Sequence, residues 1–252
     1  MGYGVKIEES DLDLKGKTVL ITGAASGIGL AMASTFFSHN ATVLLADKDS
    51  IGLQKTSKET SGSATMVFDQ GNLTSIEEMV ASLECPDILL NNAGILWAGP
   101  FDEMPADVIT KIVNVNLLGP IRIAQAVGKQ MLKRGSGVIV NTSSQLAFHG
   151  SAERAVYAST KAGIAQFTKS IAAEWAPKGV RVVAIAPGRT LTNINAKLLN
   201  SAEKQKEALK GIPAGRLAEA YEMARLALLL SSDVLSYVVG ETVVSDGGYV
   251  LL

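Results

Sequence analysis

The sequence contains few of the residues on which disulfides and metal centres depend. Among 252 residues there is one cysteine, Cys85, and there are two histidines, His39 and His149. A single cysteine cannot form a disulfide within the chain, and two imidazoles with one thiol supply few of the ligands that zinc prefers. We therefore expect neither a disulfide framework nor a metal site.

The sequence also lacks an excess of charge and a long apolar run. The formal net charge is −1, so bulk electrostatics do not favour nucleic acid or an anionic membrane as a partner. No apolar run reaches the roughly 18 residues that a membrane span needs. The first residues, MGYGVKIEESDLDLKG, do not resemble a secretory signal. These absences predict a cytoplasmic protein that binds neither nucleic acid nor membrane.

Short apolar runs alternate with longer amphipathic stretches, and hydrophobic residues make up 47% of the chain. Continuous Val- and Ile-rich runs are typical of strands that are buried on both faces of a parallel sheet. Strands are predicted at 18–22, 41–47, 64–68, 87–91, 137–143, 180–186 and 241–245. Helices are predicted at 27–38, 49–60, 74–84, 105–134, 155–177 and 218–231. This alternation predicts an α/β fold with a doubly wound sheet and helices on both faces.

One stretch interrupts the alternation of strands and helices. Residues 190–215 are polar and lysine-rich, and they lie between a predicted strand and the next helix. No repeat, low-complexity tract or Pro/Gly/Ser linker divides the rest of the chain. We therefore expect a single domain over residues 1–252, with residues 190–215 as a flexible lid.

A glycine-rich turn, TGAASGIG, follows the first predicted strand. Gly23, Gly27 and Gly29 would let the backbone turn tightly and approach a pyrophosphate at the N-terminus of the next helix. The second predicted strand ends in Asp47, about where a carboxylate must lie to hydrogen-bond the ribose of a bound adenosine. The turn therefore predicts a dinucleotide site.

A second motif, AVYASTKAG, places Tyr157 and Lys161 four residues apart. On a helix, these two side chains lie one turn apart on the same face. A positive charge at that distance, together with the positive charge of a bound oxidised dinucleotide, favours the phenolate and should lower the pKa of the tyrosine. The spacing alone is also common on solvated helix faces, so its meaning depends on the remaining motifs.

Together, these motifs resemble those of the short-chain dehydrogenase/reductase family, and the resemblance runs from about residue 14 to the C-terminus. The glycine spacing is Gly-x-x-x-Gly-x-Gly, and the other signals follow in the family's order. They are Asp69, NNAG (91–94), Asn116 in NVN, Ser144 in NTSS, YASTK (157–161), PGRTLT (187–192) and DGG (246–248). The sequence DQGNLTS after the third strand departs from the family, because this region is shorter and less acidic than usual.

The resemblance implies a single Rossmann-like domain with a seven-stranded parallel sheet that binds NAD or NADP. Asp47 favours NAD, because the extra phosphate of NADP would lie against a carboxylate. The implied cofactor-binding residues are Gly23, Ser26, Gly27, Ile28, Gly29, Asp47, Asp69, Gln70, Asn92, Ala93, Gly94, Tyr157, Lys161, Pro187, Gly188, Thr190 and Thr192.

The resemblance also implies a catalytic set of Asn116, Ser144, Tyr157 and Lys161. Tyr157 would exchange a proton with the substrate oxygen, Ser144 would hydrogen-bond that oxygen, and Lys161 would serve both Tyr157 and the nicotinamide ribose. Ser143 competes with Ser144, but adjacent strand residues face opposite sides, and the family spacing to tyrosine selects Ser144. Asn116 would hold a relay water, or alternatively brace a bend in its helix.

Substrate contacts are expected from Ser144, Gln145, His149 and Tyr157, although a loop histidine is more often simply solvated. More broadly, the resemblance places substrate specificity in residues 145–154 and the lid. We expect an NAD-dependent oxidoreductase that interconverts a secondary alcohol, with a sugar or polyol as the expected class, and its ketone.

Three further expectations concern alternative functions and assembly. One alternative is a 3-oxoacyl-acyl-carrier-protein reductase, for which Lys129 suits a basic docking patch, whereas Asp47 and Ala173 fit less well. Another is a dinucleotide-binding redox sensor without turnover, although such proteins usually lose one of the catalytic residues. The long helices and the apolar end GGYVLL favour a homotetramer.

Overall fold

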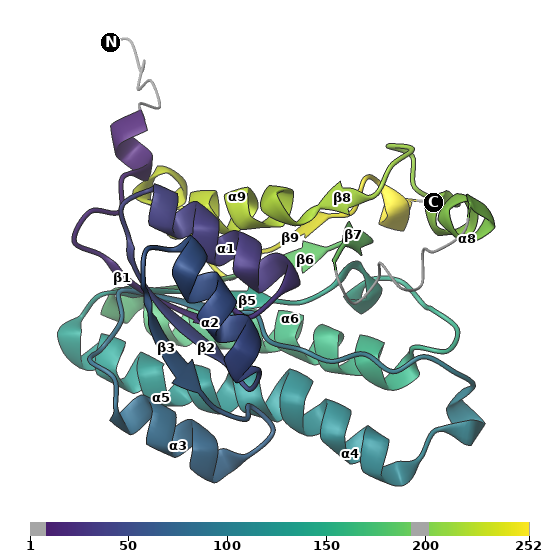
Figure 1. Cartoon of the computed structure of the whole chain (residues 1–252), viewed down its shortest axis with the longest axis horizontal. Helices are drawn as coiled ribbons and strands as arrows, with labels where there is room; N and C mark the ends of the chain where they lie inside the picture. The colour runs from purple at the N-terminus through teal and green to yellow at the C-terminus, as the bar shows by residue number, and fades with distance from the viewer. Residues whose placement is uncertain (1–8, 193–201, 252) are drawn as a thin grey trace.

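A seven-stranded parallel sheet forms the centre of the protein, with strand order β3-β2-β1-β4-β5-β6-β9 (Figure 1). The computed structural model describes residues 9–192 and 202–251. The strands are β1 Thr18–Thr22, β2 Thr42–Asp47, β3 Ala64–Val67, β4 Ile88–Asn91, β5 Gly137–Thr142, β6 Val180–Pro187 and β9 Thr242–Ser245. The predicted fold class is confirmed, and each predicted strand is present to within one residue at either end.

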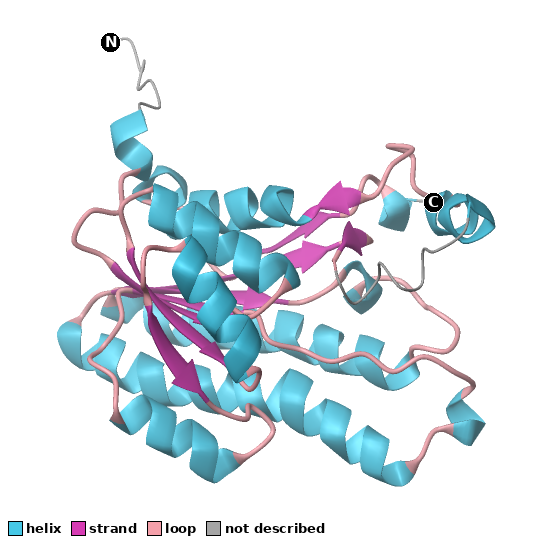
Figure 2. Cartoon of the chain, viewed as in Figure 1, coloured by secondary structure: helices cyan, strands magenta, loops and turns pink. Residues whose placement is uncertain are grey.

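Helices cover both faces of this sheet (Figure 2). On one face, α1 Gly27–Ser38, α2 Ser50–Glu59 and α9 Ala220–Ser231 pack their apolar sides into a core that includes Phe36 and Leu53. On the other face, α3 Leu73–Ala81, α5 Gly119–Arg134 and α6 Ala155–Trp175 surround Ile123, Met131 and Trp175. The two cores explain why the strand sequences are apolar on both sides.

The stretch predicted as one helix over 105–134 consists of three parts. Helix α4 covers Ala106–Val113, a π-helical segment follows at Asn114–Leu118, and α5 continues from Gly119 to Arg134. The π-helical segment holds Asn116, which is fully buried. Hydrophobic periodicity does not distinguish a short π-helical segment from the α-helix around it, and such segments are frequent at functional sites.

The described part of the predicted lid contains short elements that the sequence analysis did not predict. Strand β7, Thr190–Leu191, pairs in parallel with β8, Ala218–Glu219, and helix α8 spans Ala202–Leu209. The predicted helix over 218–231 therefore begins two residues later, at Ala220, where Glu219 and Glu222 form a capping box. The remaining lid residues, 193–201, lie outside the described residues.

The topology fixes where a ligand can bind. Strand β1 pairs with β2 on one side and with β4 on the other, so the connections leave β1 and β4 in opposite directions. In doubly wound sheets, ligands bind at the carboxyl ends of the strands beside such a switch point.

None of the helices formed by residues 9–192 and 202–251 is long and apolar enough to cross a membrane.

Candidate active site

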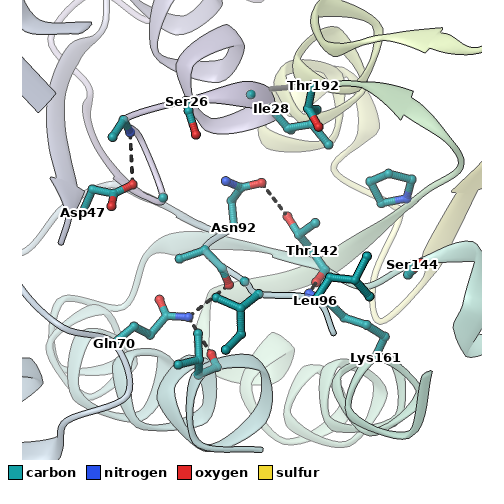
Figure 3. Close-up of a pocket in the computed structure, with 18 of the residues that line it drawn as sticks. Ser26, Ile28, Asp47, Gln70, Asn92, Leu96, Thr142, Ser144, Lys161 and Thr192 are labelled. Atoms are coloured by element: carbon teal, nitrogen blue, oxygen red, sulfur yellow. Dashed lines mark hydrogen bonds between the residues drawn. The ribbon is translucent and has the colours of Figure 1, made fainter. Parts of the chain in front are cut away.

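A cavity of about 430 Å³ opens at the carboxyl ends of the strands, beside the switch point (Figure 3). It is lined by residues that are far apart in the sequence, from the glycine turn to the segment after β6. With one exception, every residue predicted to bind the cofactor lines this cavity. The exception is Gly29, which is buried in the first turn of α1.

The glycine turn between β1 and α1 leaves no room for side chains. A Cβ atom at Gly29 would lie 2.0 Å from the Gly23 carbonyl oxygen, and one at Gly23 would lie 2.8 Å from the Ala93 Cα atom. Gly23 and Gly27 also have positive φ angles of 71° and 56°, which favour glycine. The turn thereby brings bare backbone and the N-terminus of α1 against the cavity, an arrangement that fits a pyrophosphate.

Asp47 ends β2 and faces the glycine turn across the cavity (Figure 3). Its Oδ2 atom accepts a hydrogen bond from the Ala25 amide at 3.1 Å, and its Oδ1 atom accepts one from the Asp49 amide at 3.0 Å. These two bonds fix the carboxylate in place, so a negative charge is held at the adenosine end of the cavity. Lys48 also lines this end of the cavity and is exposed.

The NNAG segment after β4 is held in place by two groups of hydrogen bonds. The Thr22 hydroxyl accepts from the Asn92 and Ala93 amides at 2.9 and 3.0 Å. The carboxamide nitrogen of Gln70 donates to the carbonyls of Ala93 and Val115, at 3.1 and 2.8 Å. Gln70 thus connects this segment to the π-helical segment, whereas Asp69 is exposed and accepts from the Gly71 amide.

Asn116 lies behind the cavity and contacts the same segment. Its side chain accepts from the Ile95 amide and donates to the Ile95 carbonyl, both at 2.8 Å. These two bonds hold the π-helical segment against the segment after NNAG, which is consistent with the bracing alternative. They leave one N–H and one lone pair of the Asn116 side chain, so a water relay through Asn116 stays a prediction.

The two adjacent serines after β5 have different partners. The Ser143 hydroxyl donates to the Lys161 carbonyl at 2.8 Å and is buried against α6. The Ser144 hydroxyl accepts from the Leu146 amide at 3.2 Å and also hydrogen-bonds the Tyr157 side chain. The Ser144 hydroxyl is therefore the one beside Tyr157, whereas the Ser143 hydroxyl is bonded to the backbone of α6.

Tyr157 and Lys161 lie one turn apart on α6, and both line the cavity. The Lys161 Nζ atom is 5.8 Å from the centre of the Tyr157 ring and donates to the Thr142 carbonyl at 2.8 Å. Burial lowers the pKa of Lys161 to about 8. Burial also raises the pKa of Tyr157, and the hydrogen bond with Ser144 opposes this shift. Without a cofactor, burial therefore determines the direction of the Tyr157 pKa shift. The lowering expected when the positive charge of an oxidised dinucleotide is also present stays a prediction.

The lowered pKa of Lys161 predicts a pH dependence of stability in the cofactor-free protein. Between about pH 8 and about pH 10.4, the unfolded chain binds this proton and the folded chain does not. The free energy of unfolding should therefore rise with pH across this window, by up to ~3 kcal/mol from this group. Urea unfolding of wild type and Lys161→Met at several pH values measures the difference. If both proteins showed the same pH dependence of the unfolding free energy, the lowered pKa of Lys161 would be contradicted.

A second cavity, of about 780 Å³, adjoins the first. The two share Leu96, Ser144, Tyr157, Pro187, Gly188 and Thr190, so they meet at the catalytic residues. The predicted substrate residue Gln145 lines the second cavity. His149 lines neither cavity and packs edge-on against Tyr249, with ring centres 5.2 Å apart.

Several residues that line the second cavity were not singled out from the sequence. They are Leu96, Arg154, Arg189, Leu217 and Tyr249. Arg154 lies in the range 145–154 that the resemblance tied to specificity, and it stands three residues before Tyr157. Tyr249 comes from the C-terminal segment, and no local sequence pattern places it in a substrate cavity.

The fold and cavity define a dinucleotide-binding oxidoreductase with a Ser-Tyr-Lys site, and comparison with known proteins gives its family. A family model described as enoyl-(acyl carrier protein) reductase matches residues 23–250. A 3-oxoacyl-acyl-carrier-protein reductase from Thermotoga maritima is 38% identical over 247 residues, covering 94% of this chain and 99% of that protein. An NAD-dependent glycerol dehydrogenase from Listeria innocua is 34% identical over 248 residues, covering 96% and 97%.

A solved structure from Beutenbergia cavernae, provisionally described as an NAD(P)-dependent gluconate 5-dehydrogenase with bound NADP, superposes with a TM-score of 0.90. It is 35% identical, and the match covers 96% of this chain and all of that chain. The chain therefore belongs to the short-chain dehydrogenase/reductase family. It is an NAD(P)-dependent enzyme of the class that acts on CH–OH groups and carbonyls.

Proposed function

We propose that the protein is an NAD-dependent dehydrogenase that interconverts a secondary alcohol of a sugar or polyol with its ketone. The observation that carries this proposal is the convergence of Ser144 and Tyr157 on the wall shared by two cavities, with Lys161 one turn from Tyr157 in the first cavity. The first cavity fits a dinucleotide, and the second leaves room for a polar substrate. Residues 190–215 serve as a lid in this proposal, because Thr190, Thr192 and α8 reach the cavity walls.

The catalytic roles follow from what each side chain can donate or accept. NAD, when bound, supplies the acceptor for the hydride that leaves the substrate carbon. Tyr157 takes the proton of the substrate hydroxyl as a phenolate, because a neutral phenol cannot accept it, and Ser144 donates a hydrogen bond to the same oxygen. Lys161 places a buried positive charge beside Tyr157 and thereby favours that phenolate, and the oxidised nicotinamide would add a second positive charge when bound. In ketone reduction the proton travels in the opposite direction.

The preference for NAD rests on Asp47. Its carboxylate is fixed by two backbone amides at the adenosine end of the cavity, where it can accept hydrogen bonds from ribose hydroxyls. A phosphate on that ribose would meet the same negative charge. Among the named relatives, one is NAD-dependent and another was solved with NADP, so relatedness alone does not decide the cofactor.

A second candidate function is reduction of a 3-oxoacyl thioester on an acyl carrier protein. The relative from Thermotoga maritima carries that name, and Lys129 is exposed on α5, where it could contact an acidic carrier. Reductases of that kind tend to carry an arginine at the position of Ala173, and alanine adds no positive charge to the patch. A redox sensor without turnover is a weaker alternative, since Ser144, Tyr157 and Lys161 are all present.

A substrate panel separates these functions. The protein is mixed with NAD and alditols, aldonates or a simple secondary alcohol, and NADH absorbance is followed; the reverse assay uses NADH or NADPH with an acetoacetyl thioester. We expect NADH formation with polyhydroxy substrates and slow reduction of the thioester. Rapid NADPH-dependent thioester reduction without polyol oxidation would instead assign the second function, and binding of NAD without turnover of any substrate would assign the sensor.

We also propose that the protein forms a homotetramer. Large apolar side chains are exposed at Leu118, the last residue of the π-helical segment, and at Tyr237, Val239 and Leu251 near the C-terminus. Covering such groups between copies would remove apolar surface from water. Light scattering coupled to size exclusion at micromolar concentration should give the mass of four chains, or of two if only one interface forms. A stable monomer would contradict the proposal.

A further inference from the structure

The second cavity is lined by both charged and polar side chains. Arg154, Arg189 and Lys204 contribute positive charges, and Glu153 and Glu207 contribute negative ones. These charges are not equally available to a ligand, so the partners of each residue decide what the cavity can recognise.

Arg189 and Glu207 are already engaged with the protein. Arg189 donates to the carbonyls of Glu207 and Ala208 near the end of α8, and its guanidinium lies 5.2 Å from the centre of the Tyr249 ring. The Glu207 carboxylate pairs with Lys210 at 2.7 Å. These contacts attach α8 to the cavity wall and leave Arg189 and Glu207 with little capacity to select a substrate.

Arg154 also lines this cavity, but it makes fewer contacts with the protein than Arg189 does. Its Nη1 atom donates to the Glu153 carbonyl at 2.9 Å and lies 3.8 Å from the Glu153 carboxylate. The Arg154 side chain is only 24% exposed, whereas that of Glu153 is 58% exposed, so the ion pair is weak and screened by water. Within the described part of the chain, the Nε and Nη2 atoms of Arg154 form no hydrogen bond. A guanidinium that is largely buried and has two free donors is suited to a carboxylate.

Gln145 adds a second, independent observation in the same cavity. Its side chain is part of a residue that is 4% exposed, and its Oε1 atom has no hydrogen-bond partner among the described residues. A buried acceptor without a partner is costly, and a substrate hydroxyl can donate to it if the side chain adjusts on binding. Gln145 follows Ser144 directly and lines the same cavity, so it is a candidate contact for a substrate held at Ser144.

Arg154 and Tyr157 come from neighbouring positions at the start of α6. Arg154 is the N-cap, Tyr157 is three residues further on, and both line the second cavity. One bound molecule can therefore contact both side chains. An open-chain sugar acid carries a carboxylate and several hydroxyls, so it can offer one group to each.

We propose that the substrate is a polyhydroxy carboxylate, with its carboxylate bound by Arg154 and a hydroxyl by Gln145. This inference rests on the proposed dehydrogenase function and narrows its substrate class. It assigns Arg154 as the residue that distinguishes sugar acids from neutral polyols of the same length.

The test compares gluconate with glucitol, two chains of equal length that differ at the terminal carboxylate. Wild type should show a kcat/KM for gluconate that is ~10- to 100-fold higher, the size expected for a charged hydrogen bond. Arg154→Gln should remove most of this preference by raising the KM for gluconate, and Arg154→Lys should restore part of it.

Two further variants sharpen the test. Glu153→Gln should lower the KM for gluconate, because it removes a competing carboxylate. Lys58→Gln, which removes an exposed charge from α2, is the control. It should change neither the kcat/KM ratio of gluconate to glucitol nor the KM for gluconate.

Direct binding provides a readout that does not depend on turnover. Titration of gluconate into the protein with NADH present should give heat with wild type and little with Arg154→Gln, whose melting temperature should match that of wild type. Equal kcat/KM values for gluconate and glucitol, or equal loss of both in Arg154→Gln, would overturn the carboxylate assignment while leaving the dehydrogenase function intact. Failure to oxidise any alcohol, with NAD bound, would instead reject the proposed function, and the inference with it.

Discussion

Tyr157→Phe should lose about 10²- to 10⁴-fold in kcat, the range expected when a general acid–base group is removed. The ring remains, so packing against Lys161 and the cavity walls should persist and NAD affinity should change by no more than a few-fold. The hydroxyl is the only atom deleted, and it is the atom that Ser144 hydrogen-bonds. Steady-state kinetics with the best substrate of the panel, together with fluorescence titration of NADH, measures both quantities.

A matched control is available on α9. Tyr221 is 48% exposed and stacks under Arg225 at 4.8 Å, so Tyr221→Phe deletes an equivalent hydroxyl outside the cavity. This variant should keep the turnover of wild type. If Tyr157→Phe retained more than a tenth of wild-type turnover, Tyr157 would not be the acid–base group.

The cofactor preference should depend on the charge of Asp47. A penalty of ~3 kcal/mol against the ribose phosphate of NADP corresponds to a preference for NAD of roughly a hundredfold in kcat/KM. Asp47→Ser should reduce this preference to within a few-fold of unity, and Lys48 would then be free to approach the phosphate. Measuring kcat/KM with NAD and with NADP at fixed substrate gives the ratio for each protein.

A second variant separates charge from structure, since Asp47 also accepts from the Ala25 and Asp49 amides. Asp47→Asn removes the charge and keeps one carbonyl acceptor for the turn, so it should shift the ratio in the same direction. Asp102→Ser changes an exposed aspartate on the loop after NNAG and should leave the ratio unchanged. Equal use of both cofactors by wild type, or an unchanged ratio in both Asp47 variants, would reject the role of Asp47.

The fold could be predicted because its signals are local. The inner strands of the sheet are continuous apolar runs, and a buried parallel strand requires that pattern, whereas the edge strand β3 is mostly exposed. The π-helical segment at Asn114–Leu118 was missed because hydrophobic periodicity does not distinguish it from the α-helices on either side. Strands β7 and β8 are two residues each, too short for any alternating pattern to appear.

The site was predictable to the extent that motifs define it. The turn at Gly23, Asp47 and the Tyr157–Lys161 pair are tied to positions that the topology brings to one edge of the sheet. Arg154 and Tyr249 reach the second cavity through a loop and the C-terminal segment, whose paths only tertiary structure reveals. The burial that raises the pKa of Tyr157 in the absence of cofactor could not be read from the spacing, because spacing shows a nearby charge and not desolvation.

Transfer of a labelled hydrogen tests the central claim most directly. A polyhydroxy substrate deuterated at the oxidised carbon is incubated with NAD and the protein, and the NADH and the product are analysed by mass spectrometry. The account predicts one deuterium in each NADH formed, ketone in equal amount, and at least a hundredfold slower formation of both with Tyr157→Phe. NADH without deuterium, or no NADH from any deuterated alcohol while NAD is bound, would contradict hydride transfer at this site.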